Sequence, residues 1–294
     1  MGQAPYTVDG YAEGLRIVTG LMDLDGPNVN PVCRTRLYTH GHRTQRALLL
    51  LHGLTSCPQQ FDALGKRFHE EGWNVLIPRY PRHGYTDRLT TSISELRADH
   101  LTAVANRSAT AAAGLGEHLT VVGHSLGGVL AGYLAQTHGS VEHAVLVAPA
   151  FGLKGVPRGG MSVLARFASV LPNFFIWWDA KSKELSRPAH GYPRFATHAY
   201  AALFQVATEV LKSASKTGPK ARDLAVITNA AEPRLDNRFA NLLVEAWRRR
   251  DAQVSTYEFP LSAHLPHDLI DPGNDEQDID LVYPVVARMI KGGD

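Results

Sequence analysis

Cysteine is scarce in this sequence, with only Cys33 and Cys57 among 294 residues. Two cysteines cannot supply the several crosslinks that hold small secreted domains together, so a disulfide-rich scaffold is excluded. A single bridge between them stays open as an alternative, but no spacing motif favours it. We therefore expect two free thiols in a reducing compartment.

Long apolar runs are also missing. The fully apolar stretches are far shorter than the roughly 20 residues that a membrane-spanning helix needs. The first 20 residues show no apolar segment behind a basic start, which a secretory leader would have. We expect no stable membrane insertion and a cytoplasmic location.

Neither sign of charge is in excess, because 30 Lys and Arg residues oppose 28 Asp and Glu residues, for a formal net charge of +2. Such a balance argues against nucleic acid or a membrane surface as a partner. No cluster of His, Cys or carboxylates has metal-ligand spacing, and the glycines at 123–128 lack the dinucleotide pattern Gly-x-Gly-x-x-Gly. We expect no metal and no cofactor.

The sequence does contain short apolar runs that alternate with segments of helical periodicity. This alternation is typical of βαβ units, which build a mostly parallel sheet. A chain of this length can bury a large core. The predicted strands are two peripheral ones at Leu15–Val18 and Val32–Tyr38 and six others at Ala47–Leu51, Asn74–Ile77, Leu119–Val122, His143–Val147, Asp223–Thr228 and Val254–Phe259.

The most informative motif is Gly-x-Ser-x-Gly at 123–127. It directly follows the predicted strand Leu119–Val122 and precedes the helical run Val129–Ala135. A strand, a sharp turn and a helix are the context in which this motif presents its serine above a sheet. Ser125 is therefore the candidate nucleophile, and the Leu126 N–H is expected to face the same space.

Residues 123–128 resemble the nucleophile elbow of serine esterases and lipases of the α/β-hydrolase family, and the similarity extends from about residue 46 to the end. The resemblance implies an α/β fold with a mostly parallel central sheet, flanked by helices. It also implies a helical cap inserted after the sixth strand, where Gly, Pro and aromatic residues cluster. The expected core is 1–150 with 221–294, and the expected cap is 151–220.

The family resemblance also implies an oxyanion hole made of backbone amides. The loop after the strand Ala47–Leu51 carries the second amide in this fold. By similarity to the family's His-Gly-x pattern, the Leu54 N–H is that donor, beside the Leu126 N–H. Thr55 follows directly and is expected to line the substrate site.

A serine hydroxyl needs a base in contact and a third group that orients the base. The chain order in this fold is serine, acid, histidine. His267 begins His-Asp-Leu-Ile-Asp-Pro, an arrangement similar to that of related hydrolases, and is favoured over His264 as the base. Glu232 is favoured as the acid over Asp236, which is also a candidate N-cap for the following helix.

The cap contributes aromatic residues, of which Trp177 and Trp178 are predicted to contact the substrate. The implied function is hydrolysis of carboxylic esters of short to medium acyl chains, as in carboxylesterases and monoacylglycerol lipases. A thioesterase, an amidase and an acyltransferase with the same triad are alternatives. A noncatalytic ligand-binding protein on the same scaffold is a further one. The expected partner is a small-molecule ester, and the protein is expected to be a monomer or homodimer.

Overall fold

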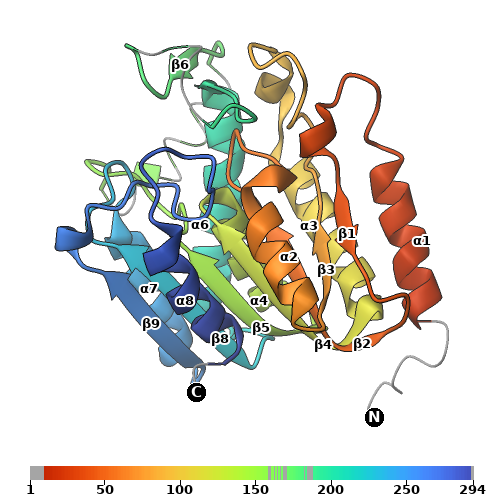
Figure 1. The fold of residues 1–294 in the computed structure, drawn as a ribbon. Helices are drawn as coiled ribbons and strands as arrows, with labels where there is room; N and C mark the ends of the chain where they lie inside the picture. The colour runs from red at the N-terminus through yellow and green to blue at the C-terminus, as the bar shows by residue number, and fades with distance from the viewer. Residues whose placement is uncertain are drawn as a thin grey trace.

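The computed structural model describes residues 10–157, 160, 161, 163, 165, 167, 171–181, 183 and 188–292. Within them, a seven-stranded sheet is flanked by helices on both faces (Figure 1). The strand order is β1-β3-β2-β4-β5-β8-β9, and every neighbouring pair is parallel except β1 with β3. The strands are β1 (Arg36–Tyr38), β2 (Thr44–Leu51), β3 (Asn74–Ile77), β4 (Gly116–His124), β5 (Val141–Val147), β8 (Asp223–Asn229) and β9 (Gln253–Phe259).

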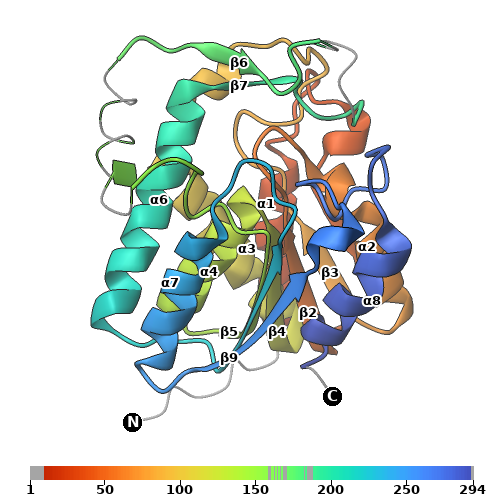
Figure 2. The ribbon, with the colours of Figure 1, turned by 90° about the vertical axis from the view of Figure 1, so that its left-hand side faces the viewer.

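The two faces of the sheet carry separate apolar layers. Successive residues of a strand point to opposite faces, so Leu49 and Leu51 of β2 belong to one layer and Leu48 and Leu50 to the other. Figure 2 shows the helices on the two sides of the sheet. One side carries α1 (Gly10–Met22), α3 (Ala98–Leu115), α4 (Leu126–Thr137), α6 (Thr197–Lys216) and α7 (Asn237–Arg248), and the other carries α2 (Asp62–Glu70) and α8 (Ile279–Ile290).

The six predicted strands from Ala47–Leu51 onwards are present, but the expected strand at Leu15–Val18 is wrong. That segment lies in α1, whose residues Gly14, Val18 and Leu21 are buried at helical spacing. A four-residue window hid this period, because it spans little more than one helical turn. The segment 151–220 therefore follows the fifth strand of the chain, β5, and not the sixth.

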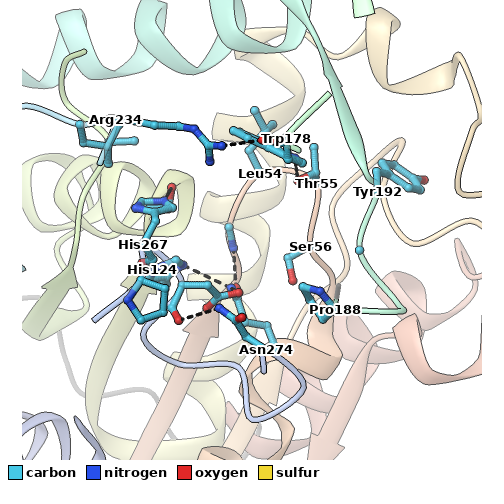
Figure 3. Close-up of a pocket in the computed structure, with 18 of the residues that line it drawn as sticks. Leu54, Thr55, Ser56, His124, Trp178, Pro188, Tyr192, Arg234, His267 and Asn274 are labelled. Carbon is cyan, nitrogen blue, oxygen red and sulfur yellow. Dashed lines mark hydrogen bonds between the residues drawn. The ribbon is translucent and has the colours of Figure 1, made fainter. Parts of the chain in front are cut away.

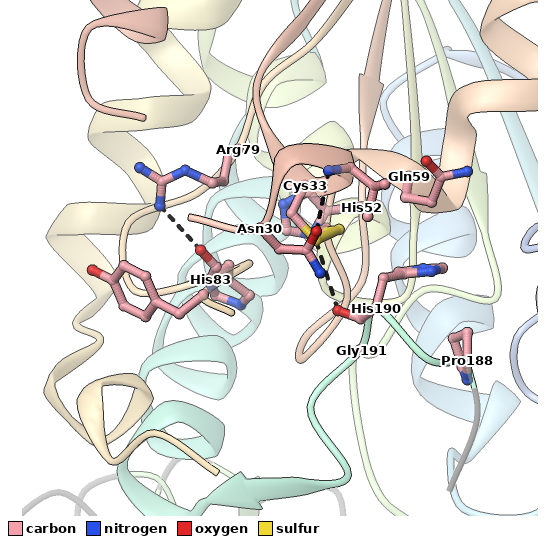
Figure 4. Close-up of a disulfide and its surroundings, with 12 residues drawn as sticks. Asn30, Cys33, His52, Gln59, Arg79, His83, Pro188, His190 and Gly191 are labelled. Carbon is pink, nitrogen blue, oxygen red and sulfur yellow. Dashed lines mark hydrogen bonds between the residues drawn. A yellow bond between two sulfur atoms is a disulfide. The ribbon is translucent and has the colours of Figure 1, made fainter. Parts of the chain in front are cut away.

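The cysteines form a disulfide between Cys33 and Cys57, so the expectation of free thiols is wrong (Figure 4). Cys33 ends a 3₁₀ turn at Pro31–Cys33, and Cys57 directly precedes the 3₁₀ turn Pro58–Phe61. Their Cα atoms are 5.1 Å apart across a sequence separation of 24 residues. The fold brings them together by laying the segment before β1 over the loop that follows β2.

The segment 151–220 contains more than helices. Its strands β6 (Phe175–Trp177) and β7 (Arg194–Ala196) pair as a short antiparallel sheet, which lies at the top of Figure 2. The predicted helix at His198–Ser213 is present as α6, which packs against α3, α4 and α7. The predicted helix at Met161–Leu171 lies mostly outside the described residues. Across the residues that the structure describes, no helix combines the length and the apolar character that a membrane crossing requires.

Candidate active site

Ser125 occupies the sharp turn between β4 and α4. Its backbone angles, φ 56° and ψ −112°, are strained for a residue with a side chain. The flanking glycines make the turn possible, because a Cβ atom at Gly123 would lie 1.9 Å from the Gly127 carbonyl oxygen. A Cβ atom at Gly127 would lie 1.8 Å from the carbonyl oxygen of Leu51. The motif is thus required by the backbone geometry that presents the Ser125 hydroxyl.

A chain of hydrogen bonds joins Ser125, His267 and Glu232. The Ser125 Oγ atom is 2.9 Å from His267 Nε2, and His267 Nδ1 is 2.6 Å from Glu232 Oε2. A neutral His267 with its hydrogen on Nδ1 donates to the carboxylate and accepts from the serine hydroxyl. The three residues follow β4, β9 and β8, so the carboxyl edge of the parallel sheet brings them together.

The surroundings of Glu232 keep it ionised. Burial acts to raise its pKa, but the hydrogen bonds from His267 and from two backbone amides outweigh this and lower the pKa to about 2. The amides are those of Arg234 and Leu235, which donate to Oε1 over 3.0 and 3.1 Å. At neutral pH a carboxylate therefore faces the imidazole.

The alternative acid and base lie elsewhere. Asp236 caps α7, where it accepts from the Arg238 N–H over 3.0 Å and pairs with the Arg238 guanidinium. His264 is exposed in a left-handed conformation with φ 49°, and its backbone N–H donates to Leu261. Neither side chain joins the hydrogen-bonded chain of Ser125.

The two residues predicted to supply oxyanion-hole amides lie on segments next to Ser125. Leu54 lines the same cavity as Ser125, and Leu126 is the first residue of α4. In the described part of the chain, neither N–H donates to a backbone acceptor outside its own helix or strand. The first amides of a helix have no partner within the helix, and its dipole favours an anion there.

Ser125 and His267 open into a cavity of about 520 Å³. The predicted contacts Thr55 and Trp178 both line it, and Trp178 Nε1 donates to Thr55 Oγ1 over 2.9 Å (Figure 3). Trp177 is not among the lining residues, because it belongs to β6 and its ring lies near Arg194. Further lining residues are apolar or aromatic on α6 (Tyr200, Leu203, Phe204) and polar on the opposite loops (Gln60, Asp268, Asn274, Glu276).

Sequence reasoning missed three polar residues that join the loops of Ser125, Glu232 and His267. Asn229 ends β8, and its Nδ2 donates to the carbonyls of Leu265 and Pro266, just before His267. Gln60 and His124 also contact the loop of His267. For Asn229 and His124 the signal was a polar residue directly after an apolar run at the carboxyl end of a strand, whereas Gln60, in a 3₁₀ turn, had no such signal. No three His, Cys, Asp or Glu residues of the described ranges are grouped so as to hold a metal ion.

Residues 48–276 match the family model described as the alpha/beta hydrolase family. The chain belongs to the alpha/beta hydrolase family. A search of curated protein sequences found no significant match for this hydrolase.

Solved structures share the hydrolase fold at low sequence identity, so they support the fold alone. A structure reported with the metagenome-derived lipolytic enzymes LipS and LipT has 16% identity and a TM-score of 0.69, covering 90% of this chain and 99% of its own. The monoacylglycerol lipase of Paleococcus ferrophilus has 16% identity and a TM-score of 0.62, with 87% and 98% covered. A soluble variant of the Saccharomyces cerevisiae monoglyceride lipase has 13% identity and a TM-score of 0.66, with 89% and 91% covered.

Proposed function

We propose that this hydrolase cleaves carboxylic esters of short to medium acyl chains through an acyl-enzyme on Ser125. The observation that carries the proposal is the continuous hydrogen-bonded chain from Ser125 through His267 to Glu232, which opens into the cavity. A strained serine, a base in contact and a buried carboxylate are the parts that acyl transfer needs.

In the proposed mechanism His267 removes the Ser125 proton as Oγ attacks the ester carbonyl. The N–H groups of Leu54 and Leu126 then donate to the oxyanion. Removing one such donor typically lowers kcat about 10²- to 10³-fold. His267 next gives its proton to the departing alcohol. Water activated by His267 cleaves the acyl-enzyme, while the Glu232 carboxylate stabilises the imidazolium in both steps.

Three residues of α6 line the cavity and would form an apolar wall for the acyl chain: Tyr200, Leu203 and Phe204. The cavity volume of about 520 Å³ is ordinary for a small-molecule site and suits a short or medium chain. We further propose that residues 151–220 act as a cap over the core formed by 1–150 and 221–294. Trp178 and Thr55 would contact the ester beneath this cap.

The test is hydrolysis of p-nitrophenyl esters from acetate to laurate by the wild type and by Ser125→Ala. We expect the wild type to cleave the shorter esters best and Ser125→Ala to show no turnover above background. Ser108→Ala is the matched control, because Ser108 is a buried serine of α3 that does not line the cavity. A folded wild type that cleaves none of these esters would refute the proposal.

A further inference from the structure

The carboxamide of Gln60 contacts three segments of the proposed active site: the Leu54 loop, the turn of Ser125 and the loop of His267. Gln60 lies in the 3₁₀ turn after the Leu54 loop and is 1% exposed. Its Oε1 accepts the backbone N–H of Gly53, the residue before Leu54, over 2.8 Å. Its Nε2 donates over 2.9 Å to Oδ2 of Asp268, the residue after His267.

The same Nε2 also reaches the nucleophile elbow. It lies 3.3 Å from Nδ1 of His124, the residue before Ser125. His124 in turn places its Nε2 2.9 Å from the backbone carbonyl oxygen of His267, and the two rings are neighbours in Figure 3. The loop of the base is therefore held from two sides, through Asp268 and through the His267 carbonyl.

Hydrogen-bonding chemistry leaves one arrangement for these groups. Only the amide oxygen of Gln60 can accept from Gly53, so its NH₂ group faces both Asp268 and His124. His124 Nδ1 must then accept, which puts the ring hydrogen on Nε2, where it donates to the His267 carbonyl. Burial lowers the pKa of His124, against the opposing effect of the Asp268 carboxylate, and so favours this neutral ring.

We propose that Gln60 is a positioning residue for the reaction, which fixes the oxyanion-hole loop relative to the loop of the catalytic base. This inference rests on the proposed function. Each partner of the carboxamide is adjacent in sequence to a group that acts on the substrate: Leu54, Ser125 or His267. Displacing such groups by about 1 Å costs about 10²-fold in rate.

The experiment compares kcat and KM of the wild type and Gln60→Met for a soluble p-nitrophenyl ester. Methionine keeps the length and the burial but makes none of the three contacts, so we expect kcat to fall about 100-fold while KM changes less than about twofold. The matched control is Gln136→Met. Gln136 is also buried and its carboxamide also joins separate segments, at Thr217 and Trp247, but it does not line the cavity.

The control separates positioning from general destabilisation, because both variants lose a buried amide network and both are expected to lower the melting temperature. A kcat for Gln60→Met within twofold of the wild type, or an equal loss of kcat in Gln136→Met, would overturn the inference while leaving ester hydrolysis intact. A wild type without esterase activity would overturn the proposed function, and this inference with it.

Gln60→Glu supplies a pH-dependent readout that a purely structural role would not change. The carboxylate keeps the acceptor for Gly53 but repels Asp268, whereas its protonated form can again donate. The titratable groups facing position 60 are His124 and Asp268, with His267 beyond them. We expect the ratio of the variant's kcat to that of the wild type to rise as the pH falls from mildly alkaline to mildly acidic. A ratio that stays constant would contradict the donor role of Gln60.

Discussion

At the residue scale, the assignment of the acid depends on how the loop after β8 is folded. Asn229 Oδ1 accepts the Ala231 N–H, and Leu235 forms an antiparallel β-bridge with Leu153. Between these two contacts the Glu232 side chain is buried. Glu232 and Asp236 are both carboxylates at plausible distances from the strand. The sequence favoured Glu232 without excluding Asp236, because the choice depends on contacts of this loop with Leu153 and with the His267 loop.

Replacing Glu232 with glutamine is expected to lower kcat by about 10³- to 10⁴-fold. The amide group can present a donor to His267 Nδ1, which favours the wrong tautomer of the ring. Steady-state kinetics on a p-nitrophenyl ester measure the effect. Asp236→Asn is the control and should keep most of the activity, since Asp236 contacts Arg238 at the start of α7. A larger loss in Asp236→Asn than in Glu232→Gln would reverse the assignment.

Glu232 also makes a pH-dependent contribution to stability. Its pKa is about 2 in the folded protein against 4.5 for an ordinary glutamate, so the carboxylate stabilises the fold above pH 4.5. This contribution is lost as the pH falls from 4.5 to about 2, and it amounts to about 3 kcal/mol at most. Urea unfolding across this range should show the stability difference between wild type and Glu232→Gln shrinking towards low pH. A difference independent of pH would contradict the assigned pKa.

At the element scale, the segment that contains β6 and β7 helps to hold the Leu54 loop. Thr55 has a positive φ of 66°, which is strained for a β-branched residue. Its Oγ1 accepts from Trp178 Nε1 over 2.9 Å, and its carbonyl accepts from the Tyr192 N–H over 2.7 Å. The strain therefore persists because Trp178 and Tyr192, of the segment 151–220, secure Thr55.

Trp178→Phe is expected to lower kcat about tenfold, since it removes one part-buried hydrogen bond from Thr55 and keeps an aromatic ring. Kinetics with the same ester measure the loss. Trp177→Phe is the matched control, because Trp177 is adjacent in sequence but does not line the cavity, and its kcat should stay unchanged. Equal effects of the two substitutions would argue against a specific role for the Trp178–Thr55 bond.

The elements themselves differed in how far sequence predicted them. The buried strands were predictable because apolar runs such as Ala47–Leu51 are covered on both faces. The pair β6 and β7 was not, because each strand has three residues and the two are joined by a long connection. For the same reason the sequence could not separate the directions of Trp177 and Trp178.

At the scale of the whole molecule, the disulfide links the N-terminal part of the chain to the loop that carries Leu54. Cys33 and Cys57 are both fully buried, and Cys33 Sγ lies 3.7 Å from the His190 carbonyl oxygen. Nothing in the spacing of two cysteines reveals that the fold brings them into contact. The expectation of a cytoplasmic location rested in part on two free thiols. The disulfide removes that argument, since stable disulfides are rare in reducing compartments.

Removing the disulfide by the double substitution Cys33→Ala and Cys57→Ala is expected to lower the free energy of unfolding by about 3 kcal/mol, because the bridge closes a loop of 24 residues. Urea unfolding of the oxidised wild type and the double variant measures the difference. Thiol titration of the unfolded wild type, without reductant, should find no reactive thiol. Two titratable thiols, or equal stability of the two proteins, would contradict the assigned bridge.

The central claim is that His267 activates Ser125, and a fluorescent alkyl fluorophosphonate tests it most directly. We expect the probe to label the wild type and His264→Ala, because the side chain of His264 is exposed and takes no part in the chain from Ser125 to Glu232. Labelling should be lost in Ser125→Ala and fall to a small fraction in His267→Ala. A folded wild type that is not labelled, or a loss of labelling in His264→Ala with full labelling of His267→Ala, would contradict the account.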